Sequence, residues 1–383
     1  NNEQKMSLHK LMRDYFSTEE FGVKPGSDKL ISKSEERANT LMKSTMKKVN
    51  LGYEIGLLWK DDKVVLPESY EQALRRLQGL ERKLEKDNEL KEWYHAEIAS
   101  YCEKGYAEVV KDNHHQLLGN KISYIPHFAV INKPKPKPRL VFDAAAKNAG
   151  ISLNSQLITG PDAVASLFGI LVRFREGSGG VSGDIKEMFH QVKIRQQDQS
   201  AQLFLYRESP TSIPKTLKMN VMIFGATCSP ACAQYVKNEN AKQFINIHPE
   251  AVTAIIQNHY VDDYLDSFDT EEAALERVSE VITIHDEANF FIRNFISNSK
   301  GLLNNLAAER VSESSLLKIT EKDQTYPKIL GQWWDTEGDC FKYILKFLNT
   351  ANEFTTKREV LSVIMKIYDP LGLLANHLLT LRL

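Results

Sequence analysis

The chain has 383 residues, of which 42% are hydrophobic and 26% charged, a composition typical of a soluble globular protein with one large core or two to three smaller ones. Its formal net charge of −1 gives no global signal for nucleic acid, so any positive groove must be local. The sequence predicts no membrane span and no signal-peptide core, and its four cysteines indicate a reducing compartment.

The first third of the chain is predicted to be mainly helical. Apolar spacing and turn residues predict helices over residues 7–16, 34–48, 70–86 and 88–104, with a short strand over 50–55. Ser69 and Gln72 resemble a capping box at the start of the third helix. Asp61 and Asp62 lie in a polar turn and are interpreted as solvated carboxylates.

A basic, proline-rich segment follows a predicted strand over residues 124–130. Residues 133–139 alternate Lys or Arg with Pro, which keeps the backbone extended and removes backbone donors. Four cations are thereby displayed before an apolar run. The segment is either a solvated hairpin tip or a site of contact with phosphate groups.

Helices and strands alternate through the rest of the chain. The predicted elements are helices over 163–176, 230–244, 270–288 and from 355, strands over 192–194, 201–206, 218–225 and 290–296, and a hairpin of 329–335 with 341–345. Asp162 and Ser229 are interpreted as N-caps. Cys228 and Cys232 stand four residues apart, but no nearby His or Cys completes a metal site, so they are interpreted as packing residues.

An acidic pair interrupts apolar sequence late in the chain. Asp262 and Asp263 follow the apolar run 254–256 and precede Leu265, a pattern that predicts strand, tight turn and strand with both acids at the turn. Burying such charges is costly unless something neutralises them, and a divalent cation would do so. An isolated pair of this kind could equally be an acidic hairpin tip in water.

A third carboxylate favours the metal site over the solvated hairpin tip. Asp184 lies near the end of a short apolar segment after a glycine-rich turn, and Phe189 follows five residues later. Together with Asp262 and Asp263 it could supply three carboxylates to two Mg²⁺ ions about 3.5–4 Å apart, the usual arrangement for in-line phosphoryl transfer.

In these segments the chain resembles reverse transcriptases. The matching motifs, in the family's order and spacing, are Asp184 with Phe189, then Phe224-Gly225-Ala226-Thr227-Cys228-Ser229-Pro230, then Tyr260-Val261-Asp262-Asp263. The closer resemblance is to BEL/Pao-type LTR retrotransposons, covers most of the chain, and includes Tyr368-Asp369-Pro370-Leu371-Gly372-Leu373-Leu374.

The resemblance implies an α+β fold: a right-hand polymerase with fingers, palm and a partial thumb, an antiparallel palm sheet backed by helices, and an N-terminal helical leader. The implied divisions are a helical leader over 1–105, fingers over 106–162 and 201–218, palm over 163–200 and 219–345 with a primer-grip hairpin, and the start of a truncated thumb or connection over 346–383.

The implied activity is that of an RNA-directed DNA polymerase, a nucleotidyltransferase that uses two Mg²⁺ ions, for which Mn²⁺ can substitute. Asp184 and Asp262 would bridge both ions, Asp263 would be a less direct third carboxylate, and the Ile185 carbonyl an extra ligand. Phe189 would reject a ribose 2′-hydroxyl, which makes deoxynucleoside triphosphates (dNTPs) the expected substrate.

Further residues receive roles from the same resemblance. Those implied to bind the dNTP are Arg139, Lys133, Phe189 and Gly225, and those implied to bind template or primer are Ser229, Pro230, Tyr260, Gly331 and Trp333. The sequence departs from the family at Asn294, where a lysine is often credited as general acid for the pyrophosphate leaving group. Lys300 or Arg293 could at most substitute for it.

The expected partners are an RNA or DNA template with an annealed primer and dNTPs, with no membrane. Protease, RNase H and integrase domains of the polyprotein are expected outside this chain. The expected location of the protein is the cytoplasm, with virus-like particles as a further possibility. Two alternatives remain: an inactive or domesticated relic that binds nucleic acid or a protein partner, and a soluble α+β protein with a metal-stabilised hairpin.

Overall fold

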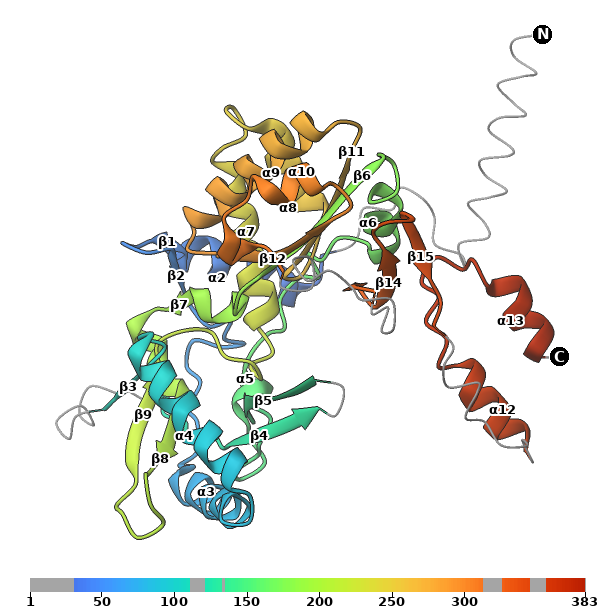
Figure 1. Ribbon diagram of the computed structural model, residues 1–383. Helices are drawn as coiled ribbons and strands as arrows, with labels where there is room; N and C mark the ends of the chain where they lie inside the picture. The colour runs from blue at the N-terminus through green and yellow to red at the C-terminus, as the bar shows by residue number, and fades with distance from the viewer. Residues whose placement is uncertain (1–30, 111–120, 133–134, 313–325, 345–355, 383) are drawn as a thin grey trace.

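The computed structural model describes residues 31–110, 121–132, 135–312, 326–344 and 356–382. The described residues form a mixed α and β structure in which small sheets are packed with helices (Figure 1). The helix predicted over 7–16 lies outside them. Within the described part, no helix has both the length and the apolar character needed to cross a membrane.

The central sheet carries the candidate site. Its strands run antiparallel in the order β10 (His259–Tyr260), β11 (Asp263–Phe268), β6 (Gly179–Ile185) and β12 (Ile292–Ser297). Side chains alternate along β11, as expected for a sheet that is covered on both faces. Tyr264 and Phe268 belong to the main core, whereas Leu265 packs with Phe174 and Trp334 on the other face.

Two helices back the sheet on the side of the main core, α8 (Pro249–Gln257) and α9 (Glu271–Asp286), and α7 (Ser229–Lys242) packs against both. The prediction of a strand at 254–256 is wrong, because this apolar run is the end of α8. Pro249 begins this helix, and buried residues at helical spacing, Ala251, Val252, Ala254 and Ile255, form its inner face.

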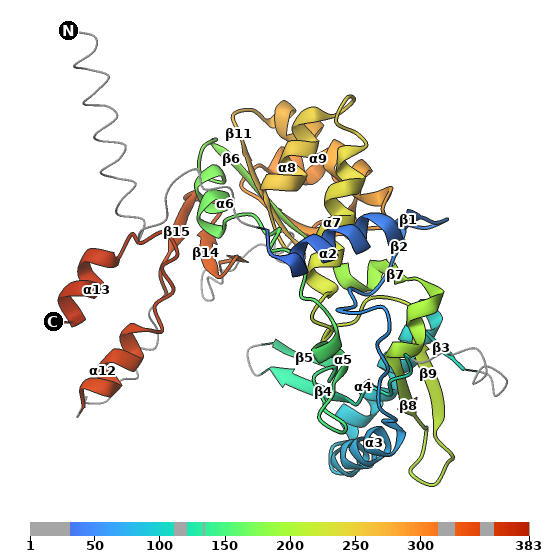
Figure 2. The same ribbon diagram turned by 180° about the vertical axis from the view of Figure 1, so that it is seen from behind.

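The opposite face of the sheet packs against α6 (Leu167–Arg173) and a three-stranded sheet of β13 (Lys328–Ile329), β14 (Gln332–Asp335) and β15 (Cys340–Lys342). Beyond β15, α12 (Lys357–Ile364) and α13 (Ala375–Arg382) lie away from the central sheet in both views (Figures 1 and 2). The hairpin predicted at 329–345 is confirmed.

A second lobe lies below the central sheet in Figure 1. It contains α3 (Tyr70–Leu84), α4 (Asn88–Glu103), a sheet of β3 (Ala107–Val109), β9 (Lys215–Met219) and β8 (Leu203–Tyr206), and the hairpin of β4 (His127–Asn132) with β5 (Lys135–Phe142). The helical pair predicted at 70–104 is confirmed. The strand predicted over 218–225 is displaced, because β9 ends at Met219.

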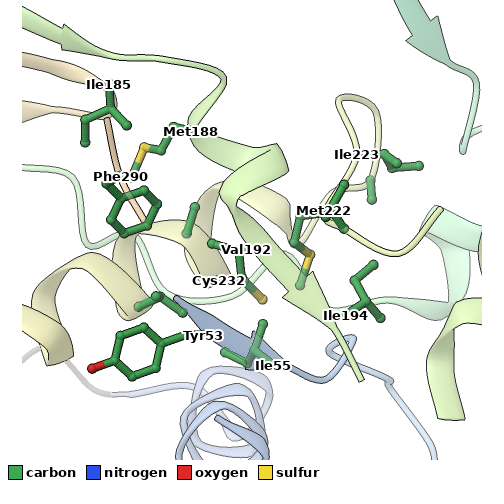
Figure 3. Packing of buried hydrophobic residues seen from close by; sticks show 14 of the residues in the cluster. Tyr53, Ile55, Ile185, Met188, Val192, Ile194, Met222, Ile223, Cys232 and Phe290 are labelled. Carbon is green, nitrogen blue, oxygen red and sulfur yellow. The ribbon is translucent and has the colours of Figure 1, made fainter. Parts of the chain in front are cut away.

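The N-terminal segment joins the two lobes. After α2 (Lys33–Thr45) and β1 (Lys47–Lys48), β2 (Tyr53–Ile55) pairs in parallel with β7 (Val192–Ile194). Figure 3 shows Tyr53 and Ile55 of β2 packed among Val192, Ile194 and Cys232. Cys228 and Cys232 are fully buried free thiols, which confirms their interpretation as packing residues.

Of the three predicted N-caps, Ser69 does stand at the N-cap position of α3, but its hydroxyl makes no capping hydrogen bond. Asp162 and Ser229 are not N-caps. Ser69 accepts a hydrogen bond from the Tyr124 amide. Asp162 accepts one from the Val164 amide, and α6 begins only after Ser166. Ser229 lies inside the first turn of α7 and donates to the Ile223 carbonyl. The domain boundaries stay a prediction.

Candidate active site

The acidic pair lies at a two-residue turn between β10 and β11. Tyr260 pairs with Asp263, so Val261 and Asp262 form the turn itself. Val261 has φ 60, a conformation that a β-branched side chain adopts only at a cost of about 1–3 kcal/mol. The turn predicted from the sequence is confirmed, and it exposes Asp262 while Asp263 is half-buried.

The neighbouring strand brings the third acid to this turn. Asp184 in β6 lies directly opposite Asp263 in β11, and opposed residues of an antiparallel pair point to the same face. The Ile185 amide also donates to the Asp262 carbonyl oxygen at 2.9 Å. Three acids from two distant segments of the chain therefore meet at one end of the central sheet.

Two residues of β12 contact Asp184 from its other side. The Asn294 Nδ2 donates to Asp184 Oδ1 at 2.5 Å, and the Arg293 Nε lies 4.0 Å from Asp184 Oδ2. The sequence identified Asn294 only as a missing lysine, and no pattern in it indicated this contact. The Asp184 side chain is 29% exposed, so solvent reaches the carboxylate between these partners.

The carboxylate donors fit a magnesium site in chemistry. Mg²⁺ prefers oxygen ligands and is usually held by one or two carboxylates together with waters and substrate phosphates. Among the described residues, no group of three or more His, Cys, Asp and Glu side chains could hold a metal ion by itself. The paired Asp184 and Asp263, beside Asp262, match the sparse protein contribution that Mg²⁺ requires, and the role of the Ile185 carbonyl stays a prediction.

Buried bases lie close to β10 and the turn that follows it. His259 of β10 contacts His285 of α9 with 3.0 Å between their Nε2 atoms, and Lys237 donates to the Ile255 carbonyl. Burial lowers the pKa of Lys237 to about 7 and that of His285 to about 3, and it holds the pKa of His259 well below its usual range. The sequence analysis missed these contacts, because a single His or Lys in the sequence gives no sign that its side chain will be buried.

Phe189 and Gly225 lie together near the base of the second lobe. The Phe189 ring centroid is 4.6 Å from that of Phe224, the residue before Gly225. Gly225 has φ +127, and a Cβ there would overlap the Phe142 carbonyl oxygen at the end of β5. Close backbone approach therefore explains this glycine without a ligand.

The basic hairpin is a pair of strands rather than a loop. Arg139 lies within β5, exposed and paired with Val130, three residues or about 10 Å along the strand from Phe142. Lys133 lies outside the described residues. The triphosphate contacts of both cations stay predictions.

The predicted template and primer residues divide into two groups. Ser229 is fully buried with its hydroxyl bonded to Ile223, so it stabilises the turn before α7, and a direct template contact is not favoured. Pro230 and Tyr260 are exposed. Gly331 is exposed at the β13–β14 turn, and Trp333 on β14 lies under the Lys328 ammonium, 4.9 Å from the ring centroid. Their nucleic-acid contacts stay predictions.

Comparisons with known proteins find similarity among solved structures. No family model matches the chain, and no curated protein matches it. Among solved structures, the chain is similar to a foamy viral protease–reverse transcriptase in complex with double-stranded DNA, with 13% sequence identity and a TM-score of 0.46. The match covers 90% of this chain and 54% of that chain, so the chain spans about half of its length.

Proposed function

We propose that the chain is a reverse transcriptase, an RNA-directed DNA polymerase that adds deoxynucleotides to the 3′ end of a primer. The observation that carries the proposal is the pairing of β6 with β11, which sets Asp184 opposite Asp263 beside the Asp262 turn. Carboxylates gathered at an exposed sheet end suit phosphoryl transfer, which depends on positioning and charge neutralisation more than on protein acids or bases.

Asp184 and Asp262 would hold the two metal ions, with Asp263 and the Ile185 carbonyl as lesser contributors. Two Mg²⁺ ions, or Mn²⁺ in their place, would supply activation of the primer 3′-oxygen and neutralisation of the triphosphate. The backbone hydrogen bond from Ile185 to Asp262 keeps the turn against β6, so the acids reach the reacting atoms as one unit. Preorganised charge of this kind avoids a cost of rearrangement during the reaction.

The nucleotide would lie between this acidic end and the second lobe. Phe189 would exclude a ribose 2′-hydroxyl by its bulk, because packing against Phe224 limits its movement. Arg139, with Lys133, would contact the triphosphate from the basic hairpin. Tyr260, Gly331 and Trp333 would position the primer end, and Pro230 would lie near the template.

The BEL/Pao resemblance places such an activity in a retrotransposon polyprotein. Protease, RNase H and integrase activities would then belong to other segments of that polyprotein. The partners would be an RNA or DNA template with its annealed primer, in the cytoplasm or in virus-like particles.

A second candidate function is a relic that keeps the fold and binds nucleic acid or a protein partner. The observation that favours it is the Asn294 amide on Asp184, where the family has a lysine. A soluble protein with a metal-stabilised hairpin and no polymerase role is the third reading. Mg²⁺-dependent dNTP binding separates this last reading from the first.

Primer extension tests the proposal. The assay supplies an RNA template, an annealed DNA primer, dNTPs and Mg²⁺ or Mn²⁺, and compares the parent chain with Asp262→Asn and Asp61→Asn. Asp61 is the matched control, since it also belongs to an Asp-Asp pair in a polar turn, where it accepts a hydrogen bond from Lys63.

Extension by the parent and by Asp61→Asn, but not by Asp262→Asn, is the expected result. Extension that survives in Asp262→Asn contradicts the metal assignment. Absence of extension with retained binding of the template–primer favours the relic.

A further inference from the structure

The side chain of Asn294 reaches Asp184 although strand geometry alone would point it elsewhere. In the register of β12 with β6, the residue opposite Asp184 is Arg293. Successive residues of a regular strand point to opposite faces, so the residue after Arg293 should face away from the acids. The observed 2.5 Å hydrogen bond from Asn294 Nδ2 to Asp184 Oδ1 therefore needs a local change in the strand.

A β-bulge supplies that change. The pairing of β12 with β6 shifts between Arg293 and Ile296, so one extra residue is accommodated on β12. Asn294 has φ 54, in the left-handed region that asparagine tolerates better than most other residues. A bulge turns a side chain toward a new direction, here toward Asp184. The backbone irregularity and the amide–carboxylate contact form one feature.

The hydrogen bond from Asn294 restricts the Asp184 carboxylate but does not use all of its lone pairs. Each carboxylate oxygen has two lone pairs, so the amide bond on Oδ1 leaves the others available. Without a partner, a side chain that is 29% exposed would sample several rotamers and lose entropy on binding a cation. We propose that Asn294 is a positioning residue that holds the Asp184 carboxylate for a divalent cation, an inference that rests on the proposed function.

The absence of charge on the Asn294 amide matters as much as its contact with Asp184. An ammonium group at this position would form an ion pair with Asp184 and oppose the approach of a cation. An amide donates a hydrogen bond and adds no positive charge to that of Arg293, whose Nε already lies 4.0 Å from Asp184 Oδ2. The amide also carries no proton that it can transfer near neutral pH, so Asn294 is not a general acid.

Direct metal binding tests this role apart from polymerase activity. Free Mn²⁺ is measured by electron paramagnetic resonance during titration of the full chain, with and without a dNTP and in the absence of template and primer, because substrate phosphates usually complete such a site. The variants are Asn294→Gly, Asn294→Lys, Asp184→Asn and the control Asn289→Gly. Asn289 is a matched control because it has φ 61 and its amide donates to Gln191 rather than to an acid.

Glycine removes the amide without backbone strain, since it adopts positive φ readily. Asn294→Gly is expected to weaken Mn²⁺ binding by about tenfold, the usual scale for loss of a partner of a metal ligand. Asn294→Lys is expected to weaken binding as well, with a stronger dependence on salt. Asn289→Gly should bind as the parent does, and thermal unfolding of each variant reports whether it is folded.

Two results would overturn the inference. Parent-like Mn²⁺ affinity in Asn294→Gly, together with loss of binding in Asp184→Asn, refutes the positioning role and leaves the proposed function intact. Equal binding by the parent and Asp184→Asn, both with and without the dNTP, refutes both, because no cation is then held at Asp184. Tighter binding by Asn294→Lys also contradicts the charge argument.

Discussion

His190 is a buried base whose protonation the fold opposes. It follows Phe189 in the 3₁₀ helix η2 (Met188–Gln191), and rings of Tyr101, Tyr106 and Phe224 surround it. Within the described part of the chain, neither of its ring nitrogens has a hydrogen-bond partner. Burial, the largest cause, lowers the pKa of His190 to about 4, while Glu187 raises it and Lys104 lowers it further.

The lowered pKa makes stability depend on pH in a defined direction. The unfolded chain takes up a proton on this imidazole below about pH 6.5, whereas the folded chain does so only near the folded pKa of about 4. The stability contribution is therefore fully present above about pH 6.5 and is lost as the pH falls through this window. Between about pH 7 and pH 5, His190 alone should cost the folded state about 2 kcal/mol.

His190→Phe tests this value. Phenylalanine keeps an aromatic ring in the same cage and breaks no hydrogen bond of the described residues. Urea unfolding is followed at about pH 7 and about pH 5 for the parent, for His190→Phe and for the exposed control His377→Phe. Between about pH 7 and pH 5, the free energy of unfolding should decrease by about 2 kcal/mol less in His190→Phe than in the parent. The decrease in His377→Phe should equal that of the parent. An equal fall in His190→Phe and the parent would refute the reasoning, because His190 would then not resist protonation.

Three further predictions concern the turn at Gly225, the role proposed for Phe189, and the proposed binding of template and primer. Gly225→Ala should lower the urea midpoint strongly, since the new Cβ meets the Phe142 carbonyl, whereas Gly150→Ala, also at positive φ but with open space around it, should lower it by much less. Phe189→Ala should raise incorporation of ribonucleotides relative to deoxynucleotides by about tenfold or more, measured by primer extension with each substrate; an unchanged ratio would contradict its steric role. Binding of a labelled template–primer, measured by fluorescence anisotropy, should weaken about tenfold or more between about 50 and 200 mM salt, and a flat dependence would exclude a grip through phosphates.

The sequence predicted the meeting of the acids because both motifs obey local rules. Asp262 and Asp263 interrupt apolar sequence at a turn, and Asp184 ends an apolar strand after a glycine-rich turn, so each acid lies at a strand end. Pairing of β6 with β11 then follows once their apolar faces are buried against the same core. The resemblance to reverse transcriptases supplied the choice of partner strand, which periodicity alone does not give.

Elements whose identity depends on tertiary contacts could not be predicted in this way. The apolar run before His259 is equally compatible with a strand and with a buried helix. In the structure this run is part of α8, which packs against α9 as a helix. Ser69 and Ser229 have the chemistry of helix caps, but each found a partner from another segment, the Tyr124 amide and the Ile223 carbonyl. A side chain with two permitted partners is assigned only when the fold places one of them beside it.

Asn294 shows how such a contact changes the meaning of a substitution. The resemblance to reverse transcriptases implies that this residue replaces a lysine and therefore a proton donor. The bulge in β12 turns its side chain onto Asp184, where a short neutral amide can hold a carboxylate that a long charged amine would pair with instead. The same position can thus either deliver a proton toward a leaving group or fix a metal ligand, but one side chain cannot do both. With asparagine there, the leaving-group proton would come from solvent or from a substitute such as Lys300, and a rate without a decline at high pH would exclude a lysine in that role.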